Sequence, residues 1–211
     1  MLPRNTALVT ALVTALAATT AAASGGDGKL AVLDEKNGFR DAKLGADVAG
    51  FAGLAAAGKR GDALWFTRAT DKLALFETKL ARIAYGFRDA KLDTIVITGA
   101  WTLDPKLSLC EGNNDHIGDN LRKVFGKPTA THAYSSSEGK RCVREHSGGL
   151  TSPYCHVLEW RSARVRLSFF AVMTTAAGAP PPDVVRDEGW TGHSCRFVLE
   201  YARVADPATE L

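Results

Sequence analysis

The sequence lacks the short motifs that identify common enzyme classes. It has no G-x-S-x-G, H-E-x-x-H, Walker or glycine-rich dinucleotide-binding motif, so the usual signatures of hydrolases, metalloproteases and nucleotide-binding proteins are missing. It also has no C-x-x-C pair, which argues against a structural zinc site. Lys and Arg are interleaved with Asp and Glu and leave a net charge of +3, so no basic patch for nucleic acid is predicted. We expect no cofactor, no metal ion and no nucleic-acid partner.

Long hydrophobic runs are absent except at the N-terminus. There Arg4 precedes the uncharged stretch TALVTALVTALAATTAAAS, and Ala21 and Ala23 form an A-x-A pattern. This order is typical of a secretory signal peptide over residues 1–23; a retained membrane anchor is the alternative, disfavoured by the short, Thr-rich run. We therefore expect a secreted or periplasmic protein without stable membrane insertion after cleavage. The rest is divided into a flexible linker, one domain and a tail: residues 24–30, 31–205 and 206–211.

Cysteine is scarce, and the four that are present predict cross-links. An even number of cysteines in an exported chain indicates disulfides. A turn cluster around Gly148 places Cys142 opposite Cys155, so we predict a Cys142–Cys155 bridge across a hairpin. Cys110 and Cys195 then pair by elimination. A metal site that combines the cysteines with neighbouring histidines is the alternative, disfavoured because an oxidising compartment removes free thiolates.

The heptapeptide GFRDAKL occurs twice, at residues 38–44 and 86–92. The second copy lies between two stretches with strand-like alternation, IAYGF and LDTIVI, which predicts a β-hairpin with its turn at residues 88–91. The first copy has no preceding strand and leads into an Ala/Gly-rich segment, where we predict a short helix with Val48, Phe51 and Leu54 on one face. Because the flanks of the two copies do not align, we interpret them as similar turn chemistry used twice. The alternative is an old tandem duplication in which all sequence outside the heptapeptide has diverged.

The clearest predicted helix is NNDHIGDNLRKVFGKP. Its start can be capped by a residue at 113–115, its apolar stripe is Ile117, Leu121 and Phe125, and Gly126 can close it. Strand-like segments precede and follow this helix. The predicted fold class is therefore α+β, with an antiparallel β-sheet packed against one well-formed helix and one short Ala/Gly-rich helix.

Several of these elements together resemble a loosely defined group of short exported bacterial proteins of unknown function. The similarity rests on the opening NGFRDAKLG, the hairpin with Ile83, Tyr85 and Phe87 followed by KLDTIVI, the helix end VFGKP and the strands around EWRSARVRL. It covers residues 37–169 and implies a fold more than a function. The opening is also similar, more weakly, to modules of outer-membrane assembly lipoproteins and secreted β-lactamase inhibitor proteins.

Binding residues are easier to nominate than catalytic ones. Trp190 follows a proline-rich loop, and exposed Trp often anchors a partner; Arg161, Arg164 and Arg166 gather near one strand pair and suggest an anion-binding patch. We therefore expect a non-catalytic module that binds a protein, peptide or envelope component. The alternative is a small hydrolase-like enzyme whose site combines dispersed His, Asp and Ser residues, for example Asp115, His116 and Asp119.

Overall fold

The computed structural model describes residues 29–104, 108–134, 154–174 and 193–204. The predicted signal peptide, Cys142 and Trp190 lie outside these ranges. The helical elements are α1 (Ala31–Lys36), the 3₁₀ turn η1 (Val48–Gly50) and α2 (Ser108–Phe125). The strands are β1 (Gly38–Phe39), β2 (Ala42–Lys43), β3 (Leu54–Arg60), β4 (Ala63–Arg68), β5 (Ala74–Leu75), β6 (Thr78–Arg88), β7 (Lys91–Gly99), β8 (Thr102–Asp104), β9 (Ala130–Tyr134), β10 (Tyr154–Arg161), β11 (Val165–Thr174) and β12 (His193–Arg203).

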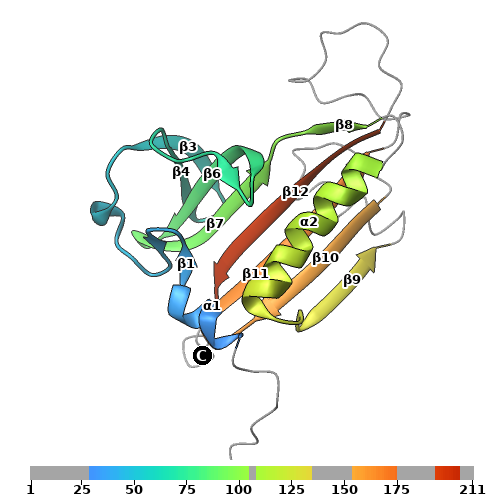
Figure 1. Ribbon diagram of the computed structural model, residues 1–211. Helices are drawn as coiled ribbons and strands as arrows, with labels where there is room; N and C mark the ends of the chain where they lie inside the picture. The colour runs from blue at the N-terminus through green and yellow to red at the C-terminus, as the bar shows by residue number, and fades with distance from the viewer. Residues whose placement is uncertain (1–28, 105–107, 135–153, 175–192, 205–211) are drawn as a thin grey trace, which may run out of the picture.

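A large antiparallel sheet dominates the described part of the chain. Its strands follow the order β3-β4-β6-β7-β12-β11-β10-β9, with β8 beside β12 and β5 beside β6. The last strand, β12, is thus inserted between the β6–β7 hairpin and the β10–β11 hairpin. Helix α2 lies across one face of the β12–β11–β10 half (Figure 1). The predicted α+β class with an antiparallel sheet and one well-formed helix is confirmed.

The core lies on the face of the sheet that α2 covers. Ile117, Leu121 and Phe125, the predicted stripe of α2, are buried against strand residues such as Leu199 and Trp160. Burial of such side chains contributes about 1.5–3 kcal/mol each. The helix ends as predicted: Gly126 adopts a φ of 81° and its N–H donates to the carbonyl of Arg122. The indole N–H of Trp160 donates to the carbonyl of Gly126 at 2.9 Å, so β10 also fixes the end of α2.

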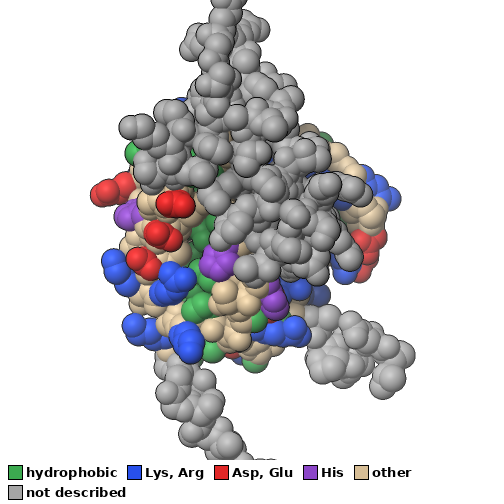
Figure 2. Space-filling model, turned by 90° about the vertical axis from the view of Figure 1, so that its right-hand side faces the viewer, with side chains coloured by type: hydrophobic (Ala, Val, Ile, Leu, Met, Phe, Trp, Pro, Cys, Tyr) green, Lys and Arg blue, Asp and Glu red, His purple; other side chains and the backbone are tan. Residues whose placement is uncertain are grey.

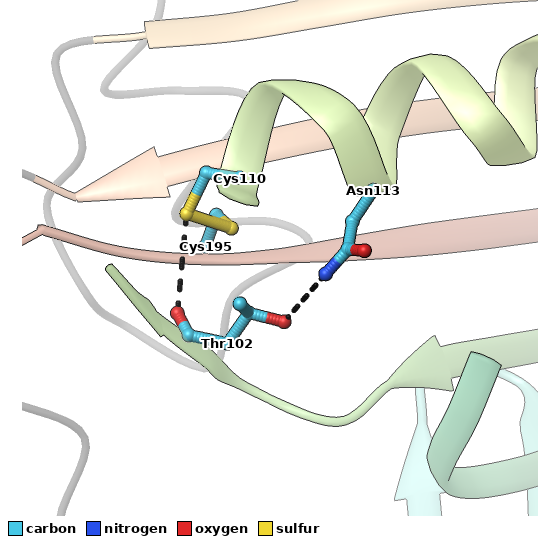
Figure 3. Close-up of a disulfide and its surroundings, with 4 residues drawn as sticks. All are labelled: Thr102, Cys110, Asn113 and Cys195. Carbon is cyan, nitrogen blue, oxygen red and sulfur yellow. Dashed lines mark hydrogen bonds between the residues drawn. A yellow bond between two sulfur atoms is a disulfide. The ribbon is translucent and has the colours of Figure 1, made fainter. Parts of the chain in front are cut away.

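Helix α2 begins earlier in the chain than the predicted capping positions, residues 113–115. It starts at Ser108, and the amide of Asn113 donates to the Thr102 hydroxyl at 3.1 Å instead of capping the helix. The reason is tertiary: Cys110, in the first turn, is joined to Cys195 of β12. Figure 3 shows the bridge, with the Cys110 disulfide sulfur also 3.9 Å from the Thr102 carbonyl oxygen. The predicted Cys110–Cys195 disulfide is confirmed, whereas the Cys142–Cys155 bridge depends on a residue outside the described ranges.

The Ala/Gly-rich segment forms only one short helical turn, and the predicted face of Val48, Phe51 and Leu54 does not form because Phe51 and Leu54 lie beyond that turn. Only η1 forms, and the chain then enters β3, which pairs with β4 along its length. Two physical reasons explain this outcome. Gly53 and Gly58 have positive φ values of 71° and 119°, which a helix does not accommodate, and the free edge of β4 offers backbone partners that outweigh the helix propensity of alanine.

The second GFRDAKL copy forms the predicted hairpin. Strands β6 and β7 pair with Arg88 opposite Lys91, leaving Asp89 and Ala90 as a two-residue turn. Both turn residues have positive φ, 49° and 59°, as a type I′ turn requires. The long alternation of apolar residues on both strands sets this register, because a shift by one residue would turn the buried face toward solvent.

The first copy also forms a hairpin, but its strands are only two residues long and its turn lies one position earlier in the heptapeptide. Here Phe39 pairs with Ala42, so the turn residues are Arg40 and Asp41, and only Arg40 has positive φ (56°). No long strand precedes it; instead the Asn37 amide and backbone bond to Leu44 and close the loop. Phe39, Ala42 and Leu44 are buried. The two hairpins are therefore not equivalent.

The two copies lie side by side in the fold. The chain that leaves the first copy runs along the second: Gly45 N–H donates to the Leu92 carbonyl at 2.7 Å, and Leu92 N–H donates to the Ala46 carbonyl at 2.8 Å. Lys91 and Asp47 form an ion pair beside these bonds. One copy thus closes the central hairpin, while the other is held against it as a separate loop. The shared sequence therefore forms a tight turn in two different structural surroundings.

Candidate functional site

The first GFRDAKL copy lines a cavity of about 340 Å³. This cavity lies between the end of α1, the β1–β2 hairpin, the chain after β5, the last turns of α2 and the end of β12. Its volume is near the lower end of the range for small-molecule sites, about 300–1,000 Å³. The lining residues are Lys36, Gly38, Phe39, Arg40, Lys43, Leu75, Phe76, Leu121, Val124, Phe125, Leu199 and Tyr201.

The floor of this cavity is apolar and buried. Phe39, Leu121, Phe125 and Leu199 are each at least nine-tenths buried, whereas Leu75, Phe76 and Val124 are half-buried at the side. The rings of Phe39 and Tyr201 lie 6.0 Å apart, centroid to centroid. A cavity built from rigid aromatic and branched side chains is pre-formed, which lowers the entropic cost of accepting an apolar ligand.

The rim is cationic. Lys36, Arg40 and Lys43 are exposed and line the cavity, and its lining contains no Asp or Glu among the described residues. Arg40 is fixed in place, because its guanidinium donates to the carbonyls of Lys72 and Ala74 at 2.6 Å each and lies 4.6 Å from the Phe39 ring centroid. The Lys43 ammonium donates to the Lys36 carbonyl at 2.5 Å. Both side chains lie at the mouth of the cavity.

One residue with a hydroxyl, Tyr201, lines the cavity. Tyr201 is 5% exposed, and its hydroxyl makes no hydrogen bond within the part of the chain that the structure describes. Burial alone raises the pKa of this phenol well above its ordinary value, so the group remains a neutral hydroxyl that can donate or accept. This hydroxyl can form a hydrogen bond with a polar atom of a ligand or with a water molecule.

A charged network holds the first copy in position over the cavity. Arg68 of β4 donates to both carboxylate oxygens of Asp41 at 2.7 and 2.9 Å and also pairs with Asp71 at 2.8 Å. The hydroxyl of Tyr85 donates to Asp71 at 2.9 Å, and burial followed by the Asp71 hydrogen bond raises its pKa. The side-chain hydrogen bond from Arg68 lowers the pKa of Asp41. The β1–β2 turn is therefore tied to β4 and β6.

Gly38 is the most constrained residue of the site, and its substitution tests the hairpin geometry. A Cβ at this position would lie 2.2 Å from the Ala42 carbonyl oxygen, and the φ of 139° disfavours any side chain. We expect Gly38→Ala to lower the free energy of unfolding by about 1–3 kcal/mol, the cost of a strained backbone, measured by urea denaturation. Gly50→Ala is the control, since a Cβ there meets nothing within 4 Å. Equal stability of the two variants would contradict the described hairpin.

The three arginines of the predicted patch lie close together in the structure, but away from the cavity. Arg161 and Arg166 are cross-strand partners in β10 and β11, and Arg164 lies in the turn between them. Arg166 forms an ion pair with Glu200 at 3.2 Å. The turn is held by Asp34, which accepts bonds from the Ser162 hydroxyl and the Arg164 backbone N–H. An anion-binding role for these arginines stays a prediction.

The predicted acid–base group on α2 is dispersed over the outside of the helix. Asp115 and His116 are exposed. The His116 ring lies 3.0 Å from the Phe76 carbonyl oxygen, and Asp119 pairs with Arg122 at 2.8 Å. These contacts do not join a carboxylate to the imidazole. In the described ranges, no group of three or more His, Cys, Asp or Glu is arranged to hold a metal ion.

Charge is separated along α2. Glu111 lies in its first turn, and Arg122 and Lys123 lie in its last turn. Figure 2 shows the same separation on this side of the molecule, with acidic side chains gathered toward one end and basic side chains toward the other. The basic end belongs to the turns whose apolar residues line the cavity, so it adds to the positive potential there. The described helices include none with the length and hydropathy needed to cross a bilayer.

The cavity was not predicted from the sequence. Its lining comes from four segments that are far apart in the sequence, and the sequence patterns indicated only two of them, the first GFRDAKL copy and the apolar stripe of α2. The excess of Lys and Arg in NGFRDAKLG, between buried Phe39 and Leu44, is the one local signal that could have indicated it. No family model, curated protein or solved structure matches this chain. The candidate site therefore rests on its own geometry.

Proposed function

We propose that this protein is an exported, non-catalytic binding module and that the cavity beside the first GFRDAKL copy holds its ligand, a small apolar molecule or chain of the cell envelope. The observation that carries the proposal is the pre-formed apolar cavity of about 340 Å³, floored by buried aromatic and aliphatic side chains. Apolar pockets with a few polar groups are the usual form of small-molecule sites.

Two further observations support a binding role in an oxidising compartment. The Cys110–Cys195 bridge joins α2 to β12, and both elements contribute walls of the cavity. Such bridges are typical of exported proteins, in agreement with the predicted signal peptide. The bridge and the Trp160–Gly126 hydrogen bond fix the two ends of α2, and a fixed wall keeps the cavity open without a ligand.

A neutral fluorescent probe tests this proposal. N-phenyl-1-naphthylamine, which is apolar and uncharged, should bind to the purified protein with enhanced emission. Leu75→Trp should weaken its binding by about tenfold or more, equivalent to about 1.4 kcal/mol, because the larger side chain occupies the cavity. Leu75 is half-buried, so the fold should tolerate the change.

The matched control is Leu73→Trp. Leu73 lies two residues away, is 44% exposed and does not line the cavity, so the same substitution there should leave probe binding unchanged. Circular dichroism of both variants checks that they fold. Absence of probe binding by the unsubstituted protein, or equal weakening by the two variants, would overturn the proposed site.

A further inference from the structure

We infer that the ligand of this cavity is an amphipathic anion: an apolar body on the cavity floor with a single acidic head group, such as a carboxylate, at the rim formed by Lys36 and Lys43. This inference rests on the proposed function, because it names the chemical class that the same cavity selects. It follows from how charge is arranged around an otherwise apolar site.

The first observation behind this inference is the position of Lys36 and Lys43. Lys36 ends α1 and Lys43 ends β2, so the Asn37–Leu44 closure of the minute hairpin brings both lysines to one side of the cavity. The Lys43 ammonium uses one donor on the Lys36 carbonyl, and an ammonium has further donors for an incoming oxygen. No carboxylate of the described residues forms an ion pair with either lysine. A ligand carboxylate would therefore meet positive charge that the protein has not already neutralised.

Arg40 supports the rim in a different way. Its guanidinium is held by two backbone carbonyls and by the face of Phe39, so it contributes a fixed positive charge and little freedom. Lys123 on the last turn of α2 extends the same sign of charge beyond the lining, whereas the neighbouring Arg122 is paired with Asp119. A site lined by one sign of charge with low-dielectric walls attracts the opposite charge and disfavours ligands of the same sign.

The floor excludes a second charge on the ligand. Leu121, Phe125 and Leu199 offer no hydrogen bond, and moving a charged group among such residues is costly. Among the described lining residues, Tyr201 alone carries a hydroxyl, and this hydroxyl can form a hydrogen bond with a single neutral oxygen of the ligand. The arrangement thus fits one charged end and one apolar end, with room for a hydroxyl or carbonyl along the body.

Three ligands with the same ten-carbon chain test the head group: decanoate, decanol and decyltrimethylammonium. Isothermal titration calorimetry or probe displacement should give decanoate an affinity about tenfold or more above decanol, about 1.4 kcal/mol or more, with the cation weakest. The preference for decanoate should fall as salt rises, because exposed charges are screened. Decanol binding should show little dependence on salt.

A double variant, Lys36→Gln with Lys43→Gln, should bring decanoate affinity close to that of decanol while leaving decanol binding unchanged. The control is Lys59→Gln with Lys79→Gln, which removes the same total charge from exposed positions outside the cavity and should preserve the preference. Equal affinity for decanoate and decanol in the unsubstituted protein would overturn the anion preference and leave the apolar cavity standing. Failure of all three ligands and of the neutral probe would overturn both. A tighter bound cation would also contradict the inference.

Discussion

Replacing Trp160 with alanine is expected to lower the free energy of unfolding by about 3–5 kcal/mol, the usual cost of removing a large buried aromatic side chain. Trp160 is fully buried and packs beside Phe125, with ring centroids 6.5 Å apart. Its indole also binds the carbonyl of Gly126 at the end of α2. The substitution therefore removes both apolar packing and the bond that fixes one end of the helix. Urea denaturation followed by far-ultraviolet circular dichroism measures the change.

Trp160→Phe separates these two contributions. It keeps most of the apolar area but leaves the Gly126 carbonyl without its indole donor, so we expect a smaller loss of about 1–3 kcal/mol. Because Phe125 and the residues near it line the cavity, Trp160→Ala should also weaken binding of the neutral probe. A loss below about 1 kcal/mol for Trp160→Ala would show that β10 and α2 are not packed as described.

Breaking the Cys110–Cys195 bridge is the second large effect that we expect. The cysteines are 85 residues apart in the chain, and the chain-entropy model assigns about 4–5 kcal/mol to closing a loop of this length, with measured losses of about 2–5 kcal/mol for native bridges. Cys110→Ala should therefore lower the free energy of unfolding by a few kcal/mol. The first turn of α2 should lose protection from amide hydrogen exchange, since the bridge tethers it to β12.

A double-mutant cycle makes this test specific. Cys110→Ala and Cys195→Ala each remove the same bond, so the double variant should cost little more than either single variant. Additive losses would indicate two independent cysteines. Peptide mapping without reduction should recover a linked Cys110–Cys195 peptide, and recovery of Cys110 linked to Cys142 would show that the pairing is wrong.

The sequence was most informative where a pattern is local and long. The alternation around Ile83, Tyr85 and Phe87 predicted the β6–β7 hairpin because a strand with one buried face has a strict period of two. The stripe of Ile117, Leu121 and Phe125 predicted α2 for the corresponding reason, the helical period. Those patterns were sufficient for the α+β class.

The sequence was misleading where local preference is weak. Residues 46–60 combine alanines, which favour a helix, with glycines, which favour none, and the available edge of β4 decided in favour of β3. Likewise, Asn113 has the chemistry of a helix cap but serves as a tertiary donor to Thr102. In both segments a partner distant in the sequence outweighed a propensity worth less than about 1 kcal/mol per residue.

The two GFRDAKL copies show most directly what the sequence by itself determined and what only the tertiary structure decided. The seven residues favoured a turn in each copy, because Asp accepts local backbone hydrogen bonds and the flanking Phe and Leu are apolar. They did not determine the register: long strands place the second turn at Asp89 and Ala90, whereas the Asn37–Leu44 closure places the first at Arg40 and Asp41. The cavity, with its cationic rim and apolar floor, depends on the register of the first copy. It exists only because α1, β1, α2 and β12 converge, and convergence is a matter of long-range packing that no seven-residue pattern can specify.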